Sequence, residues 1–447
     1  MIKTLIHQAT IVNEGLSYIG SVLIENDQIA AVYTQEVPLE VLNSCNVVEA
    51  KGKYLLPGVI DDHVHFRDPG LTHKADLETE SMAAVAGGVT SFMEMPNTKP
   101  LTVTVEAWAD KMALAKSKSL ANYAFFFGAT NDNLNELEQA DYTRACGVKV
   151  FMGSSTGNML VGQLEALEGI FKAVKGVVAV HAESEAIIQA NKARYVGEFG
   201  DDLPVTFHSL IRSAEACYES SALAVSLAKK WGTRLHLTHI STEKELSLFE
   251  SVRLEDKKIT AEVCIPHLWF DDSDYERLGN RIKCNPAIKS LTDKLALREG
   301  LKQNVLDVVA TDHAPHTLDE KQGNCLVAAS GMPGVQFSLV LMLELVHQGV
   351  LTKELVVEKM CHAPSQIFRI DRRGFIREGY YADLVLVDMD ETWTLDQSQI
   401  HSKCKWSPFE NEQFHSRVKK TWVNGALVFD NGKIASIKAA KELKFLI

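Results

Sequence analysis

The sequence predicts an α/β fold in which a parallel (β/α)8 barrel of the TIM type is joined to a small β-sandwich built from both chain ends. Three observations predict this fold. Eight short apolar runs in the middle of the chain alternate with helical stretches, as expected of strands that are covered on both faces. Both chain ends contain short β-branched runs with no helical period. Metal-ligating residue types occur at the ends of five of the eight central runs.

The length of 447 residues suits one large domain and a minor one. We expect residues 56–374 to form the barrel, and residues 1–55 together with 375–447 to form the sandwich. The predicted strands of the sandwich are 4–12, 21–25, 28–33, 46–49, 382–388, 392–395, 417–425 and 426–432. Asn424-Gly425 predicts a two-residue hairpin turn between the last two.

The predicted barrel strands are 58–61, 89–94, 122–128, 147–152, 177–180, 234–238, 259–264 and 307–311. Helical patterns between them cover 74–86, 105–116, 162–174, 209–230, 243–252 and 291–301. A doubly wound sheet is the competing fold, and it needs a glycine-rich phosphate loop after its first strand. No G-x-G-x-x-G motif follows Ile60, and no Walker A motif occurs, so the barrel is favoured.

Composition narrows the class of protein. The net charge is −12 and no basic run occurs, which argues against nucleic acid and anionic membranes as partners. No apolar stretch reaches the length of a membrane-spanning helix, and the first residues lack the apolar core of a signal peptide. The eight cysteines form no C-x-x-C pair and are expected to be reduced thiols. We therefore expect a cytoplasmic protein that acts on a small molecule.

The first barrel strand ends in His63 and His65, which lie on one face of a strand because they are two residues apart. Alone, such a pair is commonly just two polar side chains on the protein surface. Barrel enzymes place their catalytic groups at the carboxyl ends of the strands, and four further ends carry suitable side chains. The full set of predicted metal ligands is His63, His65, Lys149, His181, His239 and Asp312.

Each ligand has a plainer alternative. Lys149 could extend outward along an apolar surface, and Asp312 could cap the next helix. A lysine within an apolar strand is costly unless its charge is removed, so we expect Lys149 to react with CO2 and form a carbamate that bridges two cations. His236 lies three residues before His239, so it should face the other side of the strand and serve packing.

Oxygen and imidazole donors without thiolate suit Zn²⁺ or a similar divalent ion in a catalytic site. Two such ions lower the pKa of a shared water to about 7. The expected reaction is attack of this hydroxide on a carbonyl carbon, with Asp312 as the general acid and base that carries the proton to the leaving nitrogen.

The whole pattern resembles the amidohydrolase superfamily. Four motifs within it resemble the dihydroorotases: His63-Val-His-Phe-Arg-Asp-Pro-Gly70, Met95-Pro-Asn-Thr98, Cys284-Asn-Pro286 and Thr311-Asp-His-Ala-Pro-His316. The resemblance implies reversible cyclisation of N-carbamoyl-L-aspartate to (S)-dihydroorotate in pyrimidine biosynthesis. Many long bacterial dihydroorotases have an aspartate where this chain has Lys149, which instead resembles the carboxylated lysine of other dihydroorotases and of dihydropyrimidinases.

The resemblance also implies substrate contacts. Arg67, Asn97 and His316 would hold the substrate carboxylate, Asn285 would contact the ring, and Gly331 lies in a loop that would cover it. Asn97 and Asn285 could instead be turn residues beside prolines. His313 and His316 follow Asp312 in one loop, and we expect one of them to face the pocket.

Two other functions stay open. One is a neighbouring cyclic amidase, namely a hydantoinase (dihydropyrimidinase) or an allantoinase. The other is a non-catalytic dihydroorotase-like subunit of aspartate transcarbamoylase, although such subunits typically lack the metal ligands that this chain contains. Family members are commonly dimers, so we expect a homodimer. Residues 154–158 and 329–334 are the glycine-containing loops that could close over the substrate.

Overall fold

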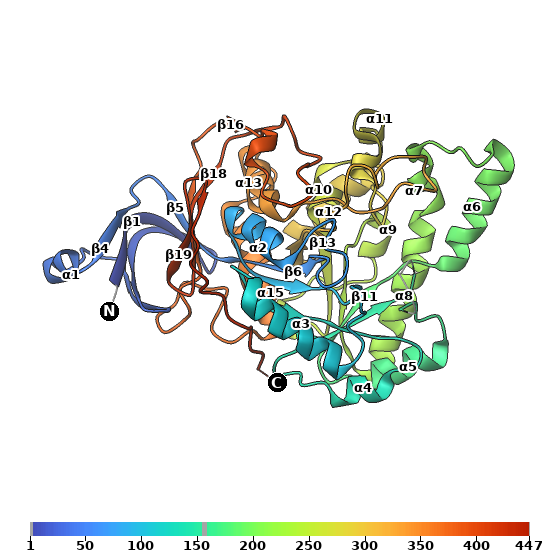
Figure 1. Ribbon diagram of the computed structural model, residues 1–447, viewed down its shortest axis with the longest axis horizontal. Helices are drawn as coiled ribbons and strands as arrows, with labels where there is room; N and C mark the ends of the chain where they lie inside the picture. Colours follow the sequence, from blue (N-terminus) through green and yellow to red (C-terminus); the bar gives the residue numbers. More distant parts are fainter. Residues whose placement is uncertain (1–2, 154–158, 447) are drawn as a thin grey trace.

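The computed structural model describes residues 3–153 and 159–446. Within these residues eight strand segments alternate with helices around a closed parallel barrel (Figure 1). The strands are β6 (Val59–Val64), β7 (Val89–Glu94), β8 (Asn122–Phe125) continued by β9 (Phe127–Gly128), β10 (Val148–Phe151), β11 (Val177–His181), β12 (Arg234–Leu237), β13 (Ile259–Cys264) and β14 (Val308–Ala310). The predicted (β/α)8 barrel is therefore confirmed.

Every pairing between neighbouring barrel strands is parallel. The barrel closes where the first strand meets the segment after the last one: Val64 forms a parallel bridge with His313, and the His65 N–H donates to the His313 carbonyl at 2.7 Å. Nearly every strand residue is buried, because helices cover the outer face and side chains fill the interior. Closure thus brings the predicted ligands of the first and last strands together.

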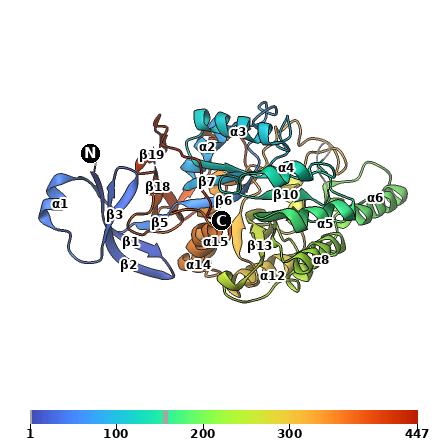
Figure 2. The ribbon, with the colours of Figure 1, turned by 90° about the horizontal axis from the view of Figure 1, so that it is seen from below.

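The predicted helices are present with shifted ends. They are α2 (Leu77–Ala86), α3 (Val105–Lys118), α5 (Leu164–Ala173), α7 (His208–Ile211) followed by α8 (Ala214–Trp231), α9 (Glu243–Leu246) and α12 (Leu291–Lys302). Asp76 and Ser290 form capping boxes that fix where α2 and α12 begin. Figure 2 shows α2, α3, α5, α8 and α12 around the outside of the barrel. None of the described helices is long and apolar enough to cross a membrane.

Further helices were not predicted. Two are long: α6 (Glu185–Phe199) and α13 (Ser338–His347). The shorter ones are α1 (Leu39–Ser44), α4 (Leu134–Gln139), α10 (Ile265–Trp269), α11 (Asp274–Leu278), α14 (Lys353–Val357) and α15 (Ala363–Phe368). Helix α6 has one buried residue, Ile188, whereas α13 is buried along most of its length. Neither helix therefore shows the one-sided apolar stripe on which a helix prediction depends.

Strands from both chain ends form one further sheet (Figure 1). Its members are β1 (Lys3–Asn13), β2 (Leu16–Glu25), β3 (Gln28–Tyr33), β4 (Asn46–Glu49), β5 (Tyr54–Pro57), β15 (Leu384–Asp388), β18 (Arg417–Val423), β19 (Ala426–Asp430) and β20 (Lys433–Ile434). A short ribbon, β16 (Trp393–Thr394) with β17 (Gln413–Phe414), lies apart from it. The two ends meet where β5 pairs with β1 and with β15. This is the β-rich second domain expected from the sequence.

The link between this sheet and the barrel is one residue long. Gly58 alone separates β5 from β6, and a side chain there would collide with Thr90, whose Oγ1 lies 2.0 Å from the position of a Cβ. The predicted hairpin at Asn424-Gly425 joins β18 to β19, with φ of 48° and 77° at these residues, as this turn type requires. The β-rich domain therefore leads directly into the strand that carries His63 and His65.

Candidate active site

A cavity of about 730 Å³ opens at the carboxyl ends of the barrel strands. Its lining contains all of the residues that the sequence indicated as metal ligands or substrate contacts: His63, His65, Arg67, Asn97, Lys149, His181, His239, Asn285, Asp312, His316 and Gly331. These residues span 269 positions of the chain, from 63 to 331. Of the two candidate covering loops, residues 329–331 line the cavity, and residues 154–158 lie outside the described residues.

The predicted ligand atoms converge in pairs. Nε2 of His63 lies 3.3 Å and Nε2 of His65 lies 3.1 Å from Oδ1 of Asp312. Nδ1 of His181 lies 2.8 Å from Nε2 of His239. Two ligands of one tetrahedral ion, each bonded at about 2.0–2.1 Å, are roughly 3.4 Å apart. The spacing of these nitrogen and oxygen atoms therefore fits divalent ions.

Side-chain oxygen atoms lie beside the outer ring nitrogen, the one away from the cavity, in three of the histidines. His63 Nδ1 lies 2.9 Å from Glu262 Oε1, and His65 Nδ1 lies 2.8 Å from Asn97 Oδ1. His181 Nε2 lies 2.9 Å from Glu183 Oε2. Glu262 and Asn97 take the outer N–H of His63 and His65, so the inner nitrogen of each ring presents a lone pair to the cavity, as metal-binding histidines do. The contact of Glu183 with His181 Nε2 has an ion-pair distance without hydrogen-bond geometry.

The charges of the site suit metal binding. Burial lowers the pKa of His65 to about 4 and also lowers the pKa of His181 and His239, so these imidazoles are neutral at pH 7. Burial alone would raise the pKa of Asp312, but His63 and His65 beside it hold it at about 2. The cavity therefore holds neutral imidazoles and an ionised carboxylate, the forms in which these side chains bind cations.

Lys149 lies in the middle of β10 and is fully buried. Its Nζ donates to Thr238 Oγ1 at 2.9 Å, and burial lowers its pKa to about 8. A lowered pKa leaves more free amine at neutral pH, which is the form that reacts with electrophiles. The position therefore fits a lysine that is modified rather than one that carries a permanent charge.

The opposite end of the cavity is cationic. Arg67 Nε donates to the Pro315 carbonyl at 3.2 Å, and its Nη2 lies 3.2 Å from His316 Nε2. Lys74, which was not predicted, also lines the cavity and lies 3.0 Å from His316 Nδ1. The exposed Lys99 lies at the rim. One wall therefore presents metal ligands, and the other presents groups that suit an anion.

Comparison with known proteins agrees with this geometry. The model of the amidohydrolase family matches residues 54–428. The chain belongs to the amidohydrolase family. It is 34% identical to a dihydroorotase of Pyrococcus furiosus over 93% of this chain and 90% of that protein. It is 31% identical to an allantoinase of Solibacter usitatus over 99% of this chain and 97% of that protein.

The fold of this amidohydrolase is close to that of a solved relative. The L-hydantoinase (dihydropyrimidinase) from Arthrobacter aurescens superposes with a TM-score of 0.94 at 27% identity. The match covers 99% of this chain and 100% of that chain. The barrel and the β-rich domain are therefore both shared. Cyclic amidohydrolases are the common chemical class of these relatives.

The amidohydrolase site contains a carboxylate that sequence reasoning missed. Oε1 of Glu262, on β13, accepts from His63 Nδ1 and from the His239 backbone N–H, both at 2.9 Å. Burial acts to raise the pKa of Glu262, yet His63 and His236 hold it well below its usual range. Its signal in the sequence is the same as that of Lys149, a charged residue within an apolar strand. Glu262 joins two of the predicted ligands.

The interpretation of His236 as a packing residue on the outer side is wrong. His236 is buried beside Asp62 and Glu262, with Nε2 3.2 Å from Asp62 Oδ2 and 3.6 Å from Glu262 Oε2. The strand alternation fails because β12 ends at Leu237 and His239 has a φ of 43°. Both histidines therefore face the barrel interior, with His236 one layer below the cavity.

Arg67 and Asp312 also leave regular strand geometry, with φ of 67° and 46°. Non-glycine residues rarely adopt this left-handed conformation, which occurs in turns and also at active sites, where the surrounding structure maintains it. Strand alternation does not set the direction of Arg67, since β6 ends at Val64. The turn after the strand, and not the strand itself, directs the guanidinium into the cavity.

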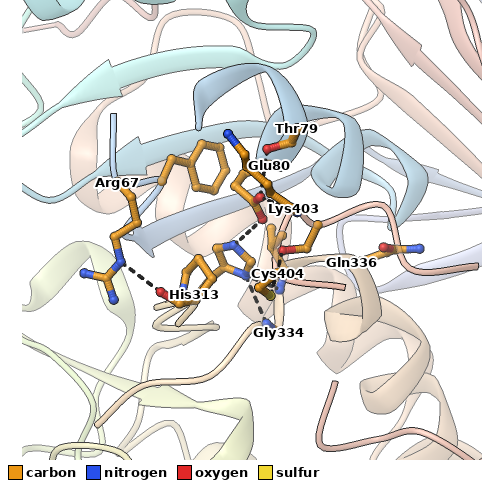
Figure 3. A network of polar contacts seen from close by, with 12 residues as sticks. Arg67, Thr79, Glu80, His313, Gly334, Gln336, Lys403 and Cys404 are labelled. Carbon is orange, nitrogen blue, oxygen red and sulfur yellow. Dashed lines mark hydrogen bonds and ion pairs between the residues drawn. The ribbon is translucent and has the colours of Figure 1, made fainter. Parts of the chain in front are cut away.

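Of the two histidines near Asp312, His316 lines the cavity and His313 points away from it. Figure 3 shows the His313 ring between Glu80 of α2 and the backbone of Gly334. His313 Nε2 lies 2.8 Å from Glu80 Oε2, and its Nδ1 accepts from the Gly334 and Val335 N–H groups. Glu80 in turn accepts from the Lys403 N–H at 2.9 Å. His313 thus anchors the Asp312 loop to a helix and to the neighbouring loop.

A buried lysine, Lys321, forms hydrogen bonds with the loop that contains Gly331. Lys321 donates to the carbonyls of Ala329 and Gly331, each at 2.8 Å, and to that of Lys283 at 2.9 Å. Gly331 has a φ of 131°, and a Cβ there would lie 2.5 Å from the Ala314 carbonyl oxygen. Only glycine fits at this point. The loop therefore brings backbone groups to the cavity without a side chain.

Proposed function

We propose that this amidohydrolase is a dihydroorotase, which interconverts N-carbamoyl-L-aspartate and (S)-dihydroorotate. One observation carries the proposal: groups that suit a carboxylate, centred on Arg67, share a single cavity with all of the predicted metal ligands. The metal ligands explain cleavage of a cyclic amide, and the cationic wall explains why the ring should carry a carboxylate. The relatives named as dihydroorotases support the same choice.

Two divalent ions, with Zn²⁺ the expected one, would be held by His63, His65, Lys149, His181, His239 and Asp312. When bound, such ions supply a nucleophilic water at neutral pH and polarise the carbonyl that it attacks. We propose that Lys149 is carboxylated, because a carbamate would replace the cationic end of this buried side chain with an anion that could hold divalent ions. Glu262 and Asn97, which accept from the outer nitrogens of His63 and His65, would keep these two histidines in the ligating tautomer.

Asp312 is proposed as the proton carrier. Its pKa of about 2 keeps it ionised, so that it can accept the proton from the attacking water during ring opening. It then gives this proton to the ring nitrogen as the carbon–nitrogen bond breaks. In the cyclisation direction the same carboxylate takes the proton from the ureido nitrogen as the carbon–nitrogen bond forms and gives it to the departing hydroxide, which leaves as water. The Asp312 side chain is 16% exposed, so it can reach solvent or a substrate in the cavity.

Arg67, Asn97 and His316 are proposed to hold the substrate carboxylate, with Asn285 at the ring and the Gly331 backbone above it. Arg67 is buried and has no carboxylate within ion-pair distance among the described residues. A buried guanidinium without an acidic partner is costly, and the substrate carboxylate would remove this cost.

A related cyclic amidase is the second candidate, because the allantoinase and L-hydantoinase relatives share the whole chain length. A non-catalytic subunit is disfavoured, because the complete ligand set lines one cavity. The test is kcat/KM for dihydroorotate, dihydrouracil and allantoin with the same enzyme. We expect dihydroorotate to be preferred, and a preference for dihydrouracil or allantoin would assign the chain to that other activity.

The remaining expectations concern the setting of the enzyme. We propose a homodimer that works in the cytoplasm without nucleic acid or membrane partners. The net charge of −12 supports the expected lack of nucleic acid and membrane partners, since it opposes contact with polyanions. Sedimentation of the purified protein tests the dimer.

A further inference from the structure

The carboxylate end of the cavity contains an uncommon arrangement around His316. Its Nδ1 lies 3.0 Å from Lys74 Nζ, a donor, and 3.1 Å from Glu320 Oε2, an acceptor. Lys74 and Glu320 are themselves an ion pair at 3.0 Å. The other ring nitrogen, Nε2, lies 3.2 Å from Arg67 Nη2. One ring nitrogen therefore has both a donor and an acceptor, and the other has a donor alone.

His316 is neutral at pH 7, because burial and the charges of Arg67 and Lys74 lower its pKa to about 2. A neutral imidazole has one N–H, which can be on either nitrogen. With the proton on Nδ1, the ring donates to Glu320 and accepts from Arg67 through Nε2. With the proton on Nε2, the ring accepts from Lys74, but its N–H then faces the N–H groups of Arg67.

The first tautomer lets the ring donate to Glu320 and accept from Arg67, and it leaves Lys74 Nζ, which lies 3.0 Å from the protonated Nδ1, paired with Glu320 alone. The second becomes favourable when an acceptor reaches Arg67, because His316 can then donate to the same acceptor. A substrate carboxylate at Arg67 is such an acceptor, whereas a ring without a carboxylate brings none. Lys74 is the group that makes the change possible, since it supplies the donor that Nδ1 needs once its proton has left.

We propose that Lys74 is a positioning residue that stabilises the Nε2–H tautomer of His316 when a substrate carboxylate binds, and that it thereby favours carboxylated rings over neutral ones. The inference rests on the dihydroorotase function proposed above and names a residue that determines its specificity. Lys74 acts through His316 and Glu320, and its ammonium need not touch the reacting atoms.

The kinetic test compares dihydroorotate with dihydrouracil, which differ only in the carboxylate. In the Lys74→Met variant we expect the ratio of the two kcat/KM values to fall about 10- to 100-fold, the loss expected for one hydrogen bond to a charged group. Lys74→Arg keeps a cationic donor and should restore most of the ratio. Both variants must be checked for wild-type circular dichroism and metal content.

Lys99→Met is the matched control. It removes one positive charge from the rim of the same cavity, and among the described residues no hydrogen bond joins Lys99 to His316. An exposed charge is worth little, so we expect the ratio to change at most about fivefold. Equal losses in Lys74→Met and Lys99→Met would overturn the proposal, because they would show a general effect of charge.

A second measurement reports the tautomer itself. Nitrogen-15 chemical shifts of the ring in histidine-labelled enzyme distinguish Nδ1–H from Nε2–H, and a His316→Asn variant assigns the signals. We expect the equilibrium mixture of dihydroorotate and N-carbamoyl-L-aspartate to move wild-type His316 from Nδ1–H to Nε2–H, and to move it far less in Lys74→Met. The same tautomer with and without these ligands would overturn the proposal.

Failure of the proposed function gives a different result. If this amidohydrolase prefers a neutral ring, wild-type enzyme already shows a dihydroorotate-to-dihydrouracil ratio below one. If the function holds and the inference fails, wild-type enzyme prefers dihydroorotate and Lys74→Met keeps that preference unchanged.

Discussion

Replacing Glu262 by glutamine should weaken metal binding without disturbing the fold. Oε1 of this buried carboxylate accepts from His63 Nδ1 and from the His239 N–H, each at 2.9 Å. Glutamine keeps the volume and one acceptor oxygen but loses the charge. Hydrogen bonds to charged groups contribute about 1.5–3 kcal/mol, against about 0.5–1.5 kcal/mol for neutral pairs. Losing the charge at two bonds therefore costs about 2–3 kcal/mol.

A cost of that size corresponds to a metal affinity about 30- to 160-fold weaker, near the upper end of the roughly 10- to 100-fold range found when outer partners of metal ligands are removed. Competition with a zinc chelator measures the affinity, and activity should return when excess zinc is added. Glu245→Gln is the control, because this glutamate is 3% exposed and accepts from the Ser221 and Thr242 hydroxyls, which touch no predicted ligand. Wild-type zinc affinity in Glu262→Gln would refute the reasoning.

Three further predictions concern single side chains. Arg67→Met should reduce kcat/KM for dihydroorotate at least 100-fold while the metal content stays near that of the wild type, since Arg67 contacts His316 and the Pro315 carbonyl. An equal loss of metal would show that the role of Arg67 is structural. Lys149→Ala should abolish activity, with partial rescue by short carboxylic acids, and full activity with one metal would exclude a bridging role. His236 binds a proton more tightly in the folded state, because Asp62 and Glu262 outweigh burial and raise its pKa to about 9. The free energy of unfolding of the wild type, measured by urea unfolding, should therefore fall by about 3 kcal/mol as pH rises from 6.5 to 9. The His236→Gln variant should lack this fall, and the same pH dependence in both proteins would contradict the assignment.

The barrel could be predicted from the sequence because its strands are covered on both faces and so appear as apolar runs. Two of the predicted runs, 89–94 and 259–264, coincide with β7 and β13. The position of the site followed from the same rule, since catalytic groups gather at the carboxyl ends of parallel strands. This rule alone predicts that His63, Lys149 and Asp312 share one site, and all three line the same cavity.

The outer partners could not be predicted, because each pairing joins positions far apart in the chain. Glu262 and His63 are separated by 199 residues, and His313 and Glu80 by 233. Lys74 has no local signal either, since a lysine before a helix is common. His236 was misplaced because the alternation of a strand ends where the backbone turns, and one sequence does not show that turn.

The central claim is that one cavity combines metal-dependent amide chemistry with recognition of a carboxylate. The most direct measurement is the rate of dihydroorotate hydrolysis by purified enzyme of known metal content, beside the rate for dihydrouracil. The account predicts about two divalent ions per chain and a clear preference for dihydroorotate, with both lost on chelation. A metal-loaded enzyme that hydrolyses dihydrouracil faster than dihydroorotate would contradict it.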